Sequence, residues 1–339
     1  MSRIDALAAA ERLEAKGAIR AGGAESPEIV FVQTCTVTNR ADRDGRRLLR
    51  RLKRESPHAV LVAAGCLAQR DPESLARLPE VDLVLGHGET EALASHLRDR
   101  DAGLLPGKIV WSAAEAHRAS DPLVLGVDPD RTRAFLKLQD GCERRCAFCV
   151  VPSVRGPERS APAGDVEERI RRLGDEGVPE VVLAGVHLAN YGKDRATTLL
   201  ELLSRLEAAP PACRVRLSSL EPMEAGAELI DLVSRSRVVV PHLHLPLQSG
   251  SDAVLRRMRR GITAARYRAL AARALANPRL HLATDLVVGF PGETDEEFAE
   301  TAALVLETRF ASLHVFPFSP RSGTHGAVLY ERGAVPDAV

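Results

Sequence analysis

Three cysteines in the spacing C-x3-C-x2-C constrain this chain more than any other feature of its sequence. Cys142, Cys146 and Cys149 come directly after an apolar run of strand length, Ala134 to Leu138. A loop this short can wrap three thiolates around one metal centre, but a closed structural zinc site needs four ligands. A 4Fe–4S cluster held by three cysteines leaves one iron open to bind another molecule. The spacing favours iron–sulfur, and a zinc knuckle completed by a distant His or Cys stays open as the alternative.

Composition indicates a globular protein. The 339 residues are enough for two domains, and 45% of them are hydrophobic and 27% charged. Lys+Arg and Asp+Glu both number 46, so the net charge neither favours nor excludes nucleic acid. No run approaches the ~18 apolar residues of a membrane span, and the first residues lack a signal-peptide pattern. We therefore expect a cytoplasmic protein without membrane attachment, whose clustered cysteines bind metal rather than form disulfides.

The first 110 residues alternate strand and helix patterns. Strands are expected over 28–34, 59–64 and 81–85, and helices over 39–54, from 71 onward and over 90–97. Continuous apolar strands between helices predict a parallel sheet covered on both faces. Functional loops of such sheets follow the carboxyl ends of the strands. Cys35 and Cys66 fall there, on equivalent loops of neighbouring strands, which favours shared metal ligation over simple burial.

The helix expected over residues 39–54 is unusually basic. Its cations are Arg40, Arg43, Arg46, Arg47, Arg50, Arg51, Lys53 and Arg54. A solvated helix face is the usual reason for such a run. A phosphate-binding surface beside the cysteines is the other interpretation. The sequence does not decide between them.

Strand–helix alternation resumes after residues 112–131, which we expect to form a linker. Strands are expected over 134–138, 180–184, 214–218, 242–247, 281–288 and 312–316. About six strand–helix units predict a parallel barrel, complete or partial, in residues 132–325. The expected fold class is α/β: an N-terminal open parallel α/β sheet domain (residues 1–111) followed by a partial (βα)6-type barrel. Residues 326–339 are expected to be a tail.

Barrel active sites gather at the carboxyl ends of the strands. The distinctive stretches of this chain follow expected strands there, at residues 185–187, 218–222, 248–251 and 289–293. Each could also be an ordinary turn or helix cap. His187 and Glu221 are the polar groups best placed to contact a cofactor. We interpret His242 and His244 as core histidines and Cys213 as a small core residue.

Together these motifs resemble the methylthiotransferase branch of the radical S-adenosylmethionine (SAM) enzymes over nearly the whole chain. Phe148, one residue before the last clustered cysteine, is part of the resemblance. The other matching segments are Thr34 to Asn39, Gly65-Cys66, the three clustered cysteines, Pro152 to Arg159, Leu243 to Ser251, Asp285 to Glu293 and Phe316 to Thr324. Within the branch, residues 185–192 and 216–222 are similar to the threonylcarbamoyladenosine tRNA methylthiotransferases, more than to the isopentenyladenosine or ribosomal-protein relatives.

The resemblance implies a two-cluster enzyme. A 4Fe–4S cluster on the three clustered cysteines would cleave SAM and release a 5′-deoxyadenosyl radical, which takes hydrogen from C2 of N6-threonylcarbamoyladenosine beside the tRNA anticodon. Acid–base catalysis cannot remove the hydrogen of an unactivated aromatic C–H, so a radical cofactor fits this reaction. A second 4Fe–4S cluster, with Cys35 and Cys66 among its ligands, would deliver a methylated sulfur, its methyl group coming from another SAM. The residues implied to line the SAM site are Gly185, Ser218, Glu221, Gln248 and Gly289.

The resemblance also implies partners. The tRNA anticodon loop is the expected substrate, because an unpaired base can be splayed out and read on its edges. A reducing donor such as flavodoxin or ferredoxin is expected to supply electrons, and we expect a monomer. The alternatives are methylthiolation of another tRNA adenosine or of a ribosomal-protein side chain, and a truncated protein that binds SAM and a cluster without transferring sulfur.

The chain departs from the family pattern at three places. The family's second cluster uses three cysteines, whereas this chain has Cys35 and Cys66. Ser2 to Asp5 resembles the family segment that comes after the missing Gly-Cys motif, so we expect that motif immediately upstream of Met1. The family usually ends in a small RNA-binding β-barrel, the TRAM domain, which we expect to be absent after Val339. Ser153 stands where the family often has an aromatic residue.

Overall fold

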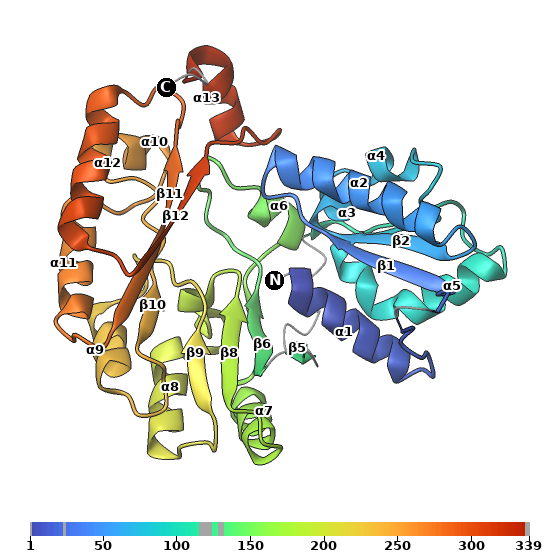
Figure 1. The fold of residues 1–339 in the computed structure, drawn as a ribbon, viewed down its shortest axis with the longest axis horizontal. Helices are drawn as coiled ribbons and strands as arrows, with labels where there is room; N and C mark the ends of the chain where they lie inside the picture. The colour runs from blue at the N-terminus through green and yellow to red at the C-terminus, as the bar shows by residue number, and fades with distance from the viewer. Residues whose placement is uncertain (1, 23–24, 115–123, 128–131, 336–339) are drawn as a thin grey trace.

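The computed structural model describes residues 2–22, 25–114, 124–127 and 132–335. Most of the expected linker and residues 336–339 of the expected tail lie outside this range. Figure 1 shows a smaller α/β unit, built from the first 110 residues, beside a larger unit in which helices lie outside a curved array of strands.

The smaller unit contains a four-stranded parallel sheet. Its strands lie in the order β1 (Ile29–Thr34), β2 (Val60–Gly65), β3 (Leu83–Leu85) and β4 (Ile109–Val110). Leu61 and Ala63 of β2 pack with Leu49 of α2 (Asn39–Glu55), whereas Val62 and Ala64 pack toward the opposite face. That opposite face is covered by α1 (Ser2–Glu14) and α5 (Leu93–Asp101). The parallel sheet covered on both faces is confirmed.

The helices begin where the sequence provides caps. Thr38 accepts a hydrogen bond from the Ala41 N–H at the start of α2, and Asp71 accepts one from Ser74 before α4 (Pro72–Ala76). Two helices of this unit were not expected from the sequence, α1 and the short α3 (Cys66–Arg70). Cys66 is therefore the first residue of a helix and does not lie in a loop.

Six parallel strands form the larger unit. They lie in two groups, β6 (Arg133–Asp140), β8 (Glu180–Gly185) and β9 (Arg214–Leu217), then β10 (His242–His244), β11 (His281–Val288) and β12 (Ser312–Pro317). A bridge between Val215 and Val239 joins the groups. Two short strands, β5 (Val124–Val127) and β7 (Arg159–Ser160), pair antiparallel with β6. The result is the expected partial barrel, with β10 shorter than the strand predicted over 242–247.

Helices cover the outside of the barrel. They are α7 (Ala163–Asp175), α8 (Leu199–Ala208), α9 (Ala227–Arg235), α10 (Asp252–Arg257), α11 (Ala264–Leu275) and α12 (Asp295–Thr308). The remaining elements are α6 (Val151–Arg155), α13 (His325–Gly333) and the 3-10 turns η1 (His87–Ala92), η3 (Leu188–Asn190) and η4 (Lys193–Arg195). A capping box between Thr294 and Glu297 fixes the start of α12.

Strand alternation divides the barrel into an apolar outer layer and an inner wall that carries both polar and apolar side chains. Leu136, Leu183 and Leu243 are fully buried in the main hydrophobic core. Because successive side chains of a strand point to opposite faces, their neighbours face the interior of the barrel. His242 and His244 are among those neighbours and are only partly buried, so their interpretation as core histidines was wrong. Cys213 is buried in the main core, as expected.

A buried arginine joins the two units. Arg321 follows β12, is 1% exposed, and donates to Asp42 Oδ2 and to Thr36 Oγ1, each at 2.6 Å. It also contacts the side chain of Asn39, whose backbone N–H donates to Ser319 Oγ at 3.0 Å. These contacts hold the N-terminal end of α2 against the segment that follows the last barrel strand.

We expect the substitution Arg321→Met to lower the free energy of unfolding by about 3 kcal/mol, because it leaves a buried carboxylate short of a partner. Arg70 still contacts Asp42 at 3.2 Å, so the loss should not exceed this value. Urea unfolding followed by circular dichroism measures the change. Arg332→Met, at an exposed arginine of α13, is the matched control and should shift stability by less than about 0.5 kcal/mol. Equal losses in both variants would contradict the role given to Arg321.

Candidate functional site

The cysteine loop begins at the carboxyl end of β6 with a glycine that no other residue could replace. Gly141 has φ +77°, and a Cβ at this position would lie 1.8 Å from the carbonyl oxygen of Pro157. Its N–H donates to Asp140 Oδ1 at 2.8 Å. The loop is therefore pinned to the strand immediately before Cys142.

Each of the three clustered thiols has its own polar neighbour. Cys142 Sγ lies 3.8 Å from His187 Nδ1, and Cys146 Sγ lies 3.7 Å from Arg260 Nη1. Cys149 Sγ accepts the Val151 N–H at 3.5 Å. All three thiols are partly buried and free of disulfides.

Burial raises the pKa of Cys146 above its usual range and that of Cys149 to about 12. Thiolates are the form that ligates metal, so occupation of this loop by a metal centre releases protons.

Arg260 connects the cysteine loop to one of the residues predicted from the sequence. Its side chain is 3% exposed and forms an ion pair with Glu221, with Nη1 donating to Oε2 at 2.8 Å. It also donates to the carbonyl of Pro246 at 2.8 Å. Glu221 is thus brought beside Cys146 through Arg260. Sequence reasoning missed Arg260, which stands in an arginine run that resembles an exposed helix end.

His187 lies at the other side of the loop. Its Nδ1 donates to Glu158 Oε1 at 2.7 Å, and Nε2 lies 3.5 Å from Glu224 Oε2. Burial alone would lower the pKa of His187, but contacts with Cys142, Glu158 and Glu224 outweigh it and raise that pKa to about 11. A cationic His187 beside Cys142 and a cationic Arg260 beside Cys146 give the loop two positive neighbours.

Two of the predicted SAM-lining residues border one cavity. Gly185 and Ser218 line a cavity of about 260 Å³ between the inner wall of β6, β8 and β9 and the start of α1. Among the described residues, the buried Ser218 Oγ has no hydrogen-bond partner. A buried hydroxyl without a partner indicates that a polar ligand or water completes the site.

The other two predicted residues, Gln248 and Gly289, come after β10 and β11, and both have a positive φ. Gln248 has φ +75° and its N–H donates to the Asp285 carbonyl at 2.8 Å. Gly289 has φ +71° and its N–H donates to Glu293 Oε2 at 2.6 Å. The next residue, Phe290, is fully buried against Ala147 of the cysteine loop. The segment that follows β11 therefore borders the cysteine loop.

Cys35 and Cys66 lie at the carboxyl ends of β1 and β2. Gly65 has φ +93°, and a Cβ there would lie 2.5 Å from the Thr34 carbonyl oxygen, so glycine is required before Cys66. Burial raises the pKa of Cys66. Next to this turn, both side-chain polar atoms of Gln33 are buried without a hydrogen-bond partner among the described residues. Two thiols and an unpaired amide fit a site completed by a further polar group.

A buried network of charges links the two cysteine sites. Arg155 of α6 is 3% exposed and donates to Asp5 Oδ2 at 2.8 Å and to Asp140 Oδ1 at 3.1 Å. Lys137 Nζ contacts the same two carboxylates at 2.7 and 3.0 Å. The positive charge of Arg155 also acts on the Cys66 thiol, where it opposes the rise in pKa that burial causes. The network runs from α1 through α6 to the strand end that carries the cysteine loop.

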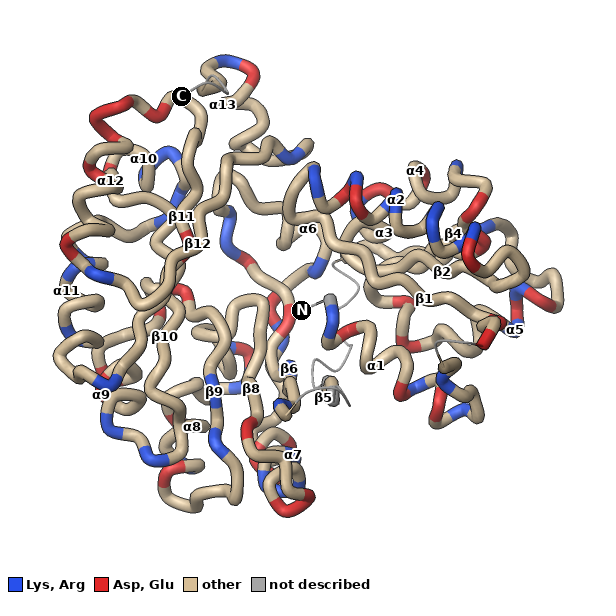
Figure 2. The backbone as a smooth tube through the Cα atoms, in the orientation of Figure 1, with Lys and Arg blue, Asp and Glu red and all other residues tan. Residues whose placement is uncertain are grey.

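Only some of the cations of the basic helix α2 have structural partners. Arg46 contacts Asp71, and Lys53 contacts Asp82, so these two cations have structural partners. Arg43, Arg50 and Arg54 are exposed, and no ionic partner within the described residues is present for them. Figure 2 shows basic and acidic positions mixed along α2. The structure leaves both interpretations of the arginine run open.

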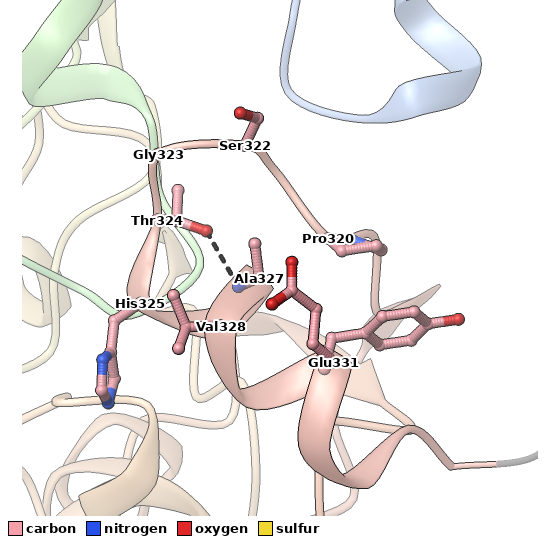
Figure 3. Close-up of a pocket in the computed structure, with 9 residues that line it drawn as sticks. Pro320, Ser322, Gly323, Thr324, His325, Ala327, Val328 and Glu331 are labelled. Atoms are coloured by element: carbon pink, nitrogen blue, oxygen red, sulfur yellow. Dashed lines mark hydrogen bonds between the residues drawn. The ribbon is translucent and has the colours of Figure 1, made fainter.

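Another surface pocket lies outside this site. A hollow of about 550 Å³ lies beside α13, where Ala327 N–H donates to Thr324 Oγ1 at 3.2 Å. Figure 3 shows the residues that line it. Among the described residues that line it, none belongs to the sites predicted from the sequence. Of the described helices, none has the length and apolar character needed to cross a membrane.

Comparison with known proteins identifies the family. The model of the radical SAM superfamily matches residues 136–305, and that of the uncharacterized protein family UPF0004 matches residues 1–86. The threonylcarbamoyladenosine tRNA methylthiotransferase MtaB of Bacillus subtilis is 38% identical over 317 residues, which cover 91% of this chain and 69% of the relative. This chain belongs to the radical SAM tRNA methylthiotransferase family. It is a transferase, and membership implies a 4Fe–4S cluster and SAM.

Relatives named for a different tRNA adenosine also match this chain. The tRNA-2-methylthio-N(6)-dimethylallyladenosine synthase of Acidothermus cellulolyticus is 35% identical over 350 residues, covering 100% of this chain and 69% of the relative. MtaB of Thermotoga maritima is 35% identical, over 91% of this chain and 70% of the relative. The family is therefore established, whereas the modified adenosine differs among its members.

Solved structures agree on the fold. The radical SAM methyltransferase TsrM from Kitasatospora setae, solved with cobalamin and a [4Fe-4S] cluster bound, superposes with a TM-score of 0.71 at 14% identity. The match covers 97% of this chain and 74% of TsrM. The cobalamin-dependent radical SAM enzyme OxsB gives a TM-score of 0.62 at 11% identity, over 97% of this chain and 52% of OxsB. At these identities the likeness shows a shared fold alone.

The buried charge network should make stability depend on pH. Burial alone would raise the pKa of Asp5, but Arg155 and Lys137 outweigh it and hold that pKa far below its usual range. A carboxyl with a depressed folded-state pKa contributes stability above its unfolded pKa of about 4 and loses it as the pH falls further. Unfolding free energies measured from pH 5 down to about pH 2 should therefore change little at first and fall steeply below about pH 4.

Asp5→Asn should flatten this pH dependence, because it removes one titrating carboxyl. Asp101→Asn, at a side chain that is 67% exposed, is the control and should keep the wild-type slope. A wild-type slope in Asp5→Asn would show that the network does not titrate as described.

Proposed function

We propose that this chain transfers a methylthio group to C2 of N6-threonylcarbamoyladenosine next to the anticodon of tRNA. The observation that carries the proposal is the physical link between the two cysteine sites. The helix that begins at Cys66, α3, packs against α6, which carries Arg155; Arg155 contacts Asp140, and Asp140 holds the glycine that precedes Cys142. A sulfur donor and a radical source have to reach the same substrate carbon, and this arrangement keeps their supporting elements in direct contact.

Cys142, Cys146 and Cys149 would hold the 4Fe–4S cluster that, with SAM, supplies a 5′-deoxyadenosyl radical. Around it, Arg260 and His187 balance the charge of the thiolates, and Glu221 orients Arg260. Ser218 and Gly185, in the cavity of about 260 Å³, would contact SAM, with Gln248 and Gly289 at neighbouring strand ends. The polar atom without a partner at Ser218 supports this assignment.

Cys35 and Cys66 would ligate a second 4Fe–4S cluster, from which the sulfur is delivered. The described residues supply two thiols at this edge, and the buried Gln33 amide lies beside them. Residues 1–111 would form the domain that holds this cluster, and residues 132–325 the radical SAM barrel. A monomer acting on the tRNA anticodon loop, with flavodoxin or ferredoxin as electron donor, completes the proposal.

The choice of adenosine rests on the polarity of the barrel interior. Relatives with either substrate have similar identities to this chain, from 33% to 38%. The inner wall carries the partly buried His242 and His244, which suit a polar substituent on the adenosine better than an apolar dimethylallyl group. This favours threonylcarbamoyladenosine.

The test is anaerobic reconstitution with iron and sulfide, followed by incubation with SAM, reductant and tRNA that carries threonylcarbamoyladenosine. We expect methylthiolated nucleoside by mass spectrometry. Cys146→Ala should abolish both SAM cleavage and product, whereas Cys66→Ala should keep SAM cleavage and lose the product. Cys213→Ala, at a cysteine in the main core, is the control and should keep both.

Three results would contradict parts of the proposal. SAM cleavage without methylthiolated product in the wild type would indicate a SAM-cleaving protein that does not transfer sulfur. Zinc instead of iron in the purified protein would contradict the radical mechanism. Product from tRNA carrying dimethylallyladenosine alone would replace the substrate and keep the reaction.

A further inference from the structure

A histidine–aspartate–histidine group lies on three neighbouring barrel strands, apart from all the cysteines. His244 Nε2 on β10 and His314 Nδ1 on β12 each lie 3.0 Å from the same oxygen of Asp285 on β11. The two imidazole rings meet edge to face, with their centroids 5.9 Å apart. One carboxylate oxygen is thus shared by two imidazoles.

This group belongs to the inner wall of the barrel. Leu243 and Leu286, the sequence neighbours of His244 and Asp285, are buried in the main core beneath the outer helices. Leu313 and Val315, on either side of His314, line an apolar groove of about 630 Å³ that also involves α12. Because side chains alternate along a strand, the histidines and Asp285 point to the interior.

The exposure of the side chains increases along the group, from His244 through Asp285 to His314. The side chain of His244 is 14% exposed, that of Asp285 22% and that of His314 60%. Ser219 occupies the remaining ring nitrogen of His244, with 2.6 Å between Oγ and Nδ1. The Nε2 atom of His314 has no partner among the described residues. The group therefore presents one unused imidazole nitrogen to the interior.

The group continues the wall of the cavity assigned to SAM. Ser219, which contacts His244, also lines the cavity of about 260 Å³ together with Ser218 and Gly185. A ligand in that cavity and a second molecule against His314 would be neighbours. This is the relation that a radical source and its substrate require.

The group can bind an anion when both ring nitrogens of His314 carry protons. Burial alone would raise the pKa of Asp285, but hydrogen bonds and charges from His244 and His314 lower it below the usual range. In that form His314 is paired with Asp285 through Nδ1 and offers its second N–H to the interior. An anionic group that accepts this N–H gains a charge-assisted hydrogen bond.

We propose that His244, Asp285 and His314 form the subsite that binds the carboxylate of the substituent on N6 of the target adenosine. The inference rests on the proposed function. A threonylcarbamoyl group ends in a carboxylate and a hydroxyl, both of which can pair with His314. A dimethylallyl group offers no acceptor and would leave this polar wall unpaired. His314 determines specificity, and Asp285 and His244 orient it.

The test compares two anticodon stem-loop RNAs, one carrying threonylcarbamoyladenosine and one in which its carboxylate is converted to the primary amide. Dissociation constants are measured by fluorescence anisotropy, and kcat/KM for methylthiolation on the reconstituted protein. We expect the wild type to prefer the carboxylate about 10- to 100-fold. His314→Leu should abolish this preference, and His314→Gln should restore part of it. His281→Leu, at an exposed histidine of β11 outside the group, should keep it.

Separate readouts distinguish the possible failures. SAM cleavage without RNA should stay within about twofold of wild type in His314→Leu, which excludes a loss of fold or cluster. A wild type that methylthiolates both RNAs equally would overturn the subsite and leave the proposed function standing. A wild type that binds and modifies neither RNA would overturn both. Two histidines and one carboxylate can also hold a divalent metal, so iron or zinc beyond the clusters that is lost in His314→Leu would overturn the subsite as well.

Discussion

The buried ion network around Arg155 is the interaction on which the arrangement of the functional site depends. Two cations, Arg155 and Lys137, face two carboxylates, Asp5 and Asp140, and all four side chains are less than 10% exposed. Charges buried this deeply are tolerated only when each is paired with good geometry. The network therefore fixes the relative positions of α1, α6 and the end of β6, and with them the cysteine loop and Cys66.

Replacement by apolar residues of similar volume would often be as stable as such a network. Apolar packing would not fix the orientation of the side chains as these ion pairs do. Arg155 reaches two carboxylates through separate nitrogens, and each contact restricts its orientation further. Packing and function are also separated along the barrel strands. Leucines on the outer side pack in the core, and the polar residues on the inner side supply functional groups.

Much of the fold could be predicted from local sequence. Apolar runs predicted β1 within one residue and β11 with its full length, because a strand covered by helices needs continuous apolar residues. The cysteine spacing pointed to the loop that the structure places at the end of β6. The helix α1 was missed because its apolar residues are mostly alanines with weak periodicity. The two histidines of β10 were misassigned because composition does not say which face of a strand points inward.

The partners of the site could not be predicted, since they depend on contacts between distant segments. Arg260 and Glu221 are 39 positions apart, and His244, Asp285 and His314 come from three strands. Glu221 was predicted, but nothing local shows that it pairs with Arg260 or that the two histidines share Asp285, and the arginine run beside Arg260 resembles an exposed helix end. Only the parallel register of β11 and β12, in which Asp285 lies opposite His314, brings the last pair together.

The position of α1 has a consequence for the exchange of parts between family members. This helix comes first in the chain, covers one face of the N-terminal sheet, and yet packs Ile4 against Phe135 and Ala184 of the barrel wall (Figure 1). Its Asp5 completes the charge balance of Arg155 and Lys137. A chimera that takes its N-terminal sheet from one protein and its barrel from another would therefore divide a single cooperative unit. The sheet and the barrel are separate in architecture, but α1 makes them inseparable as evolutionary and engineering modules unless the helix is matched to the barrel it covers.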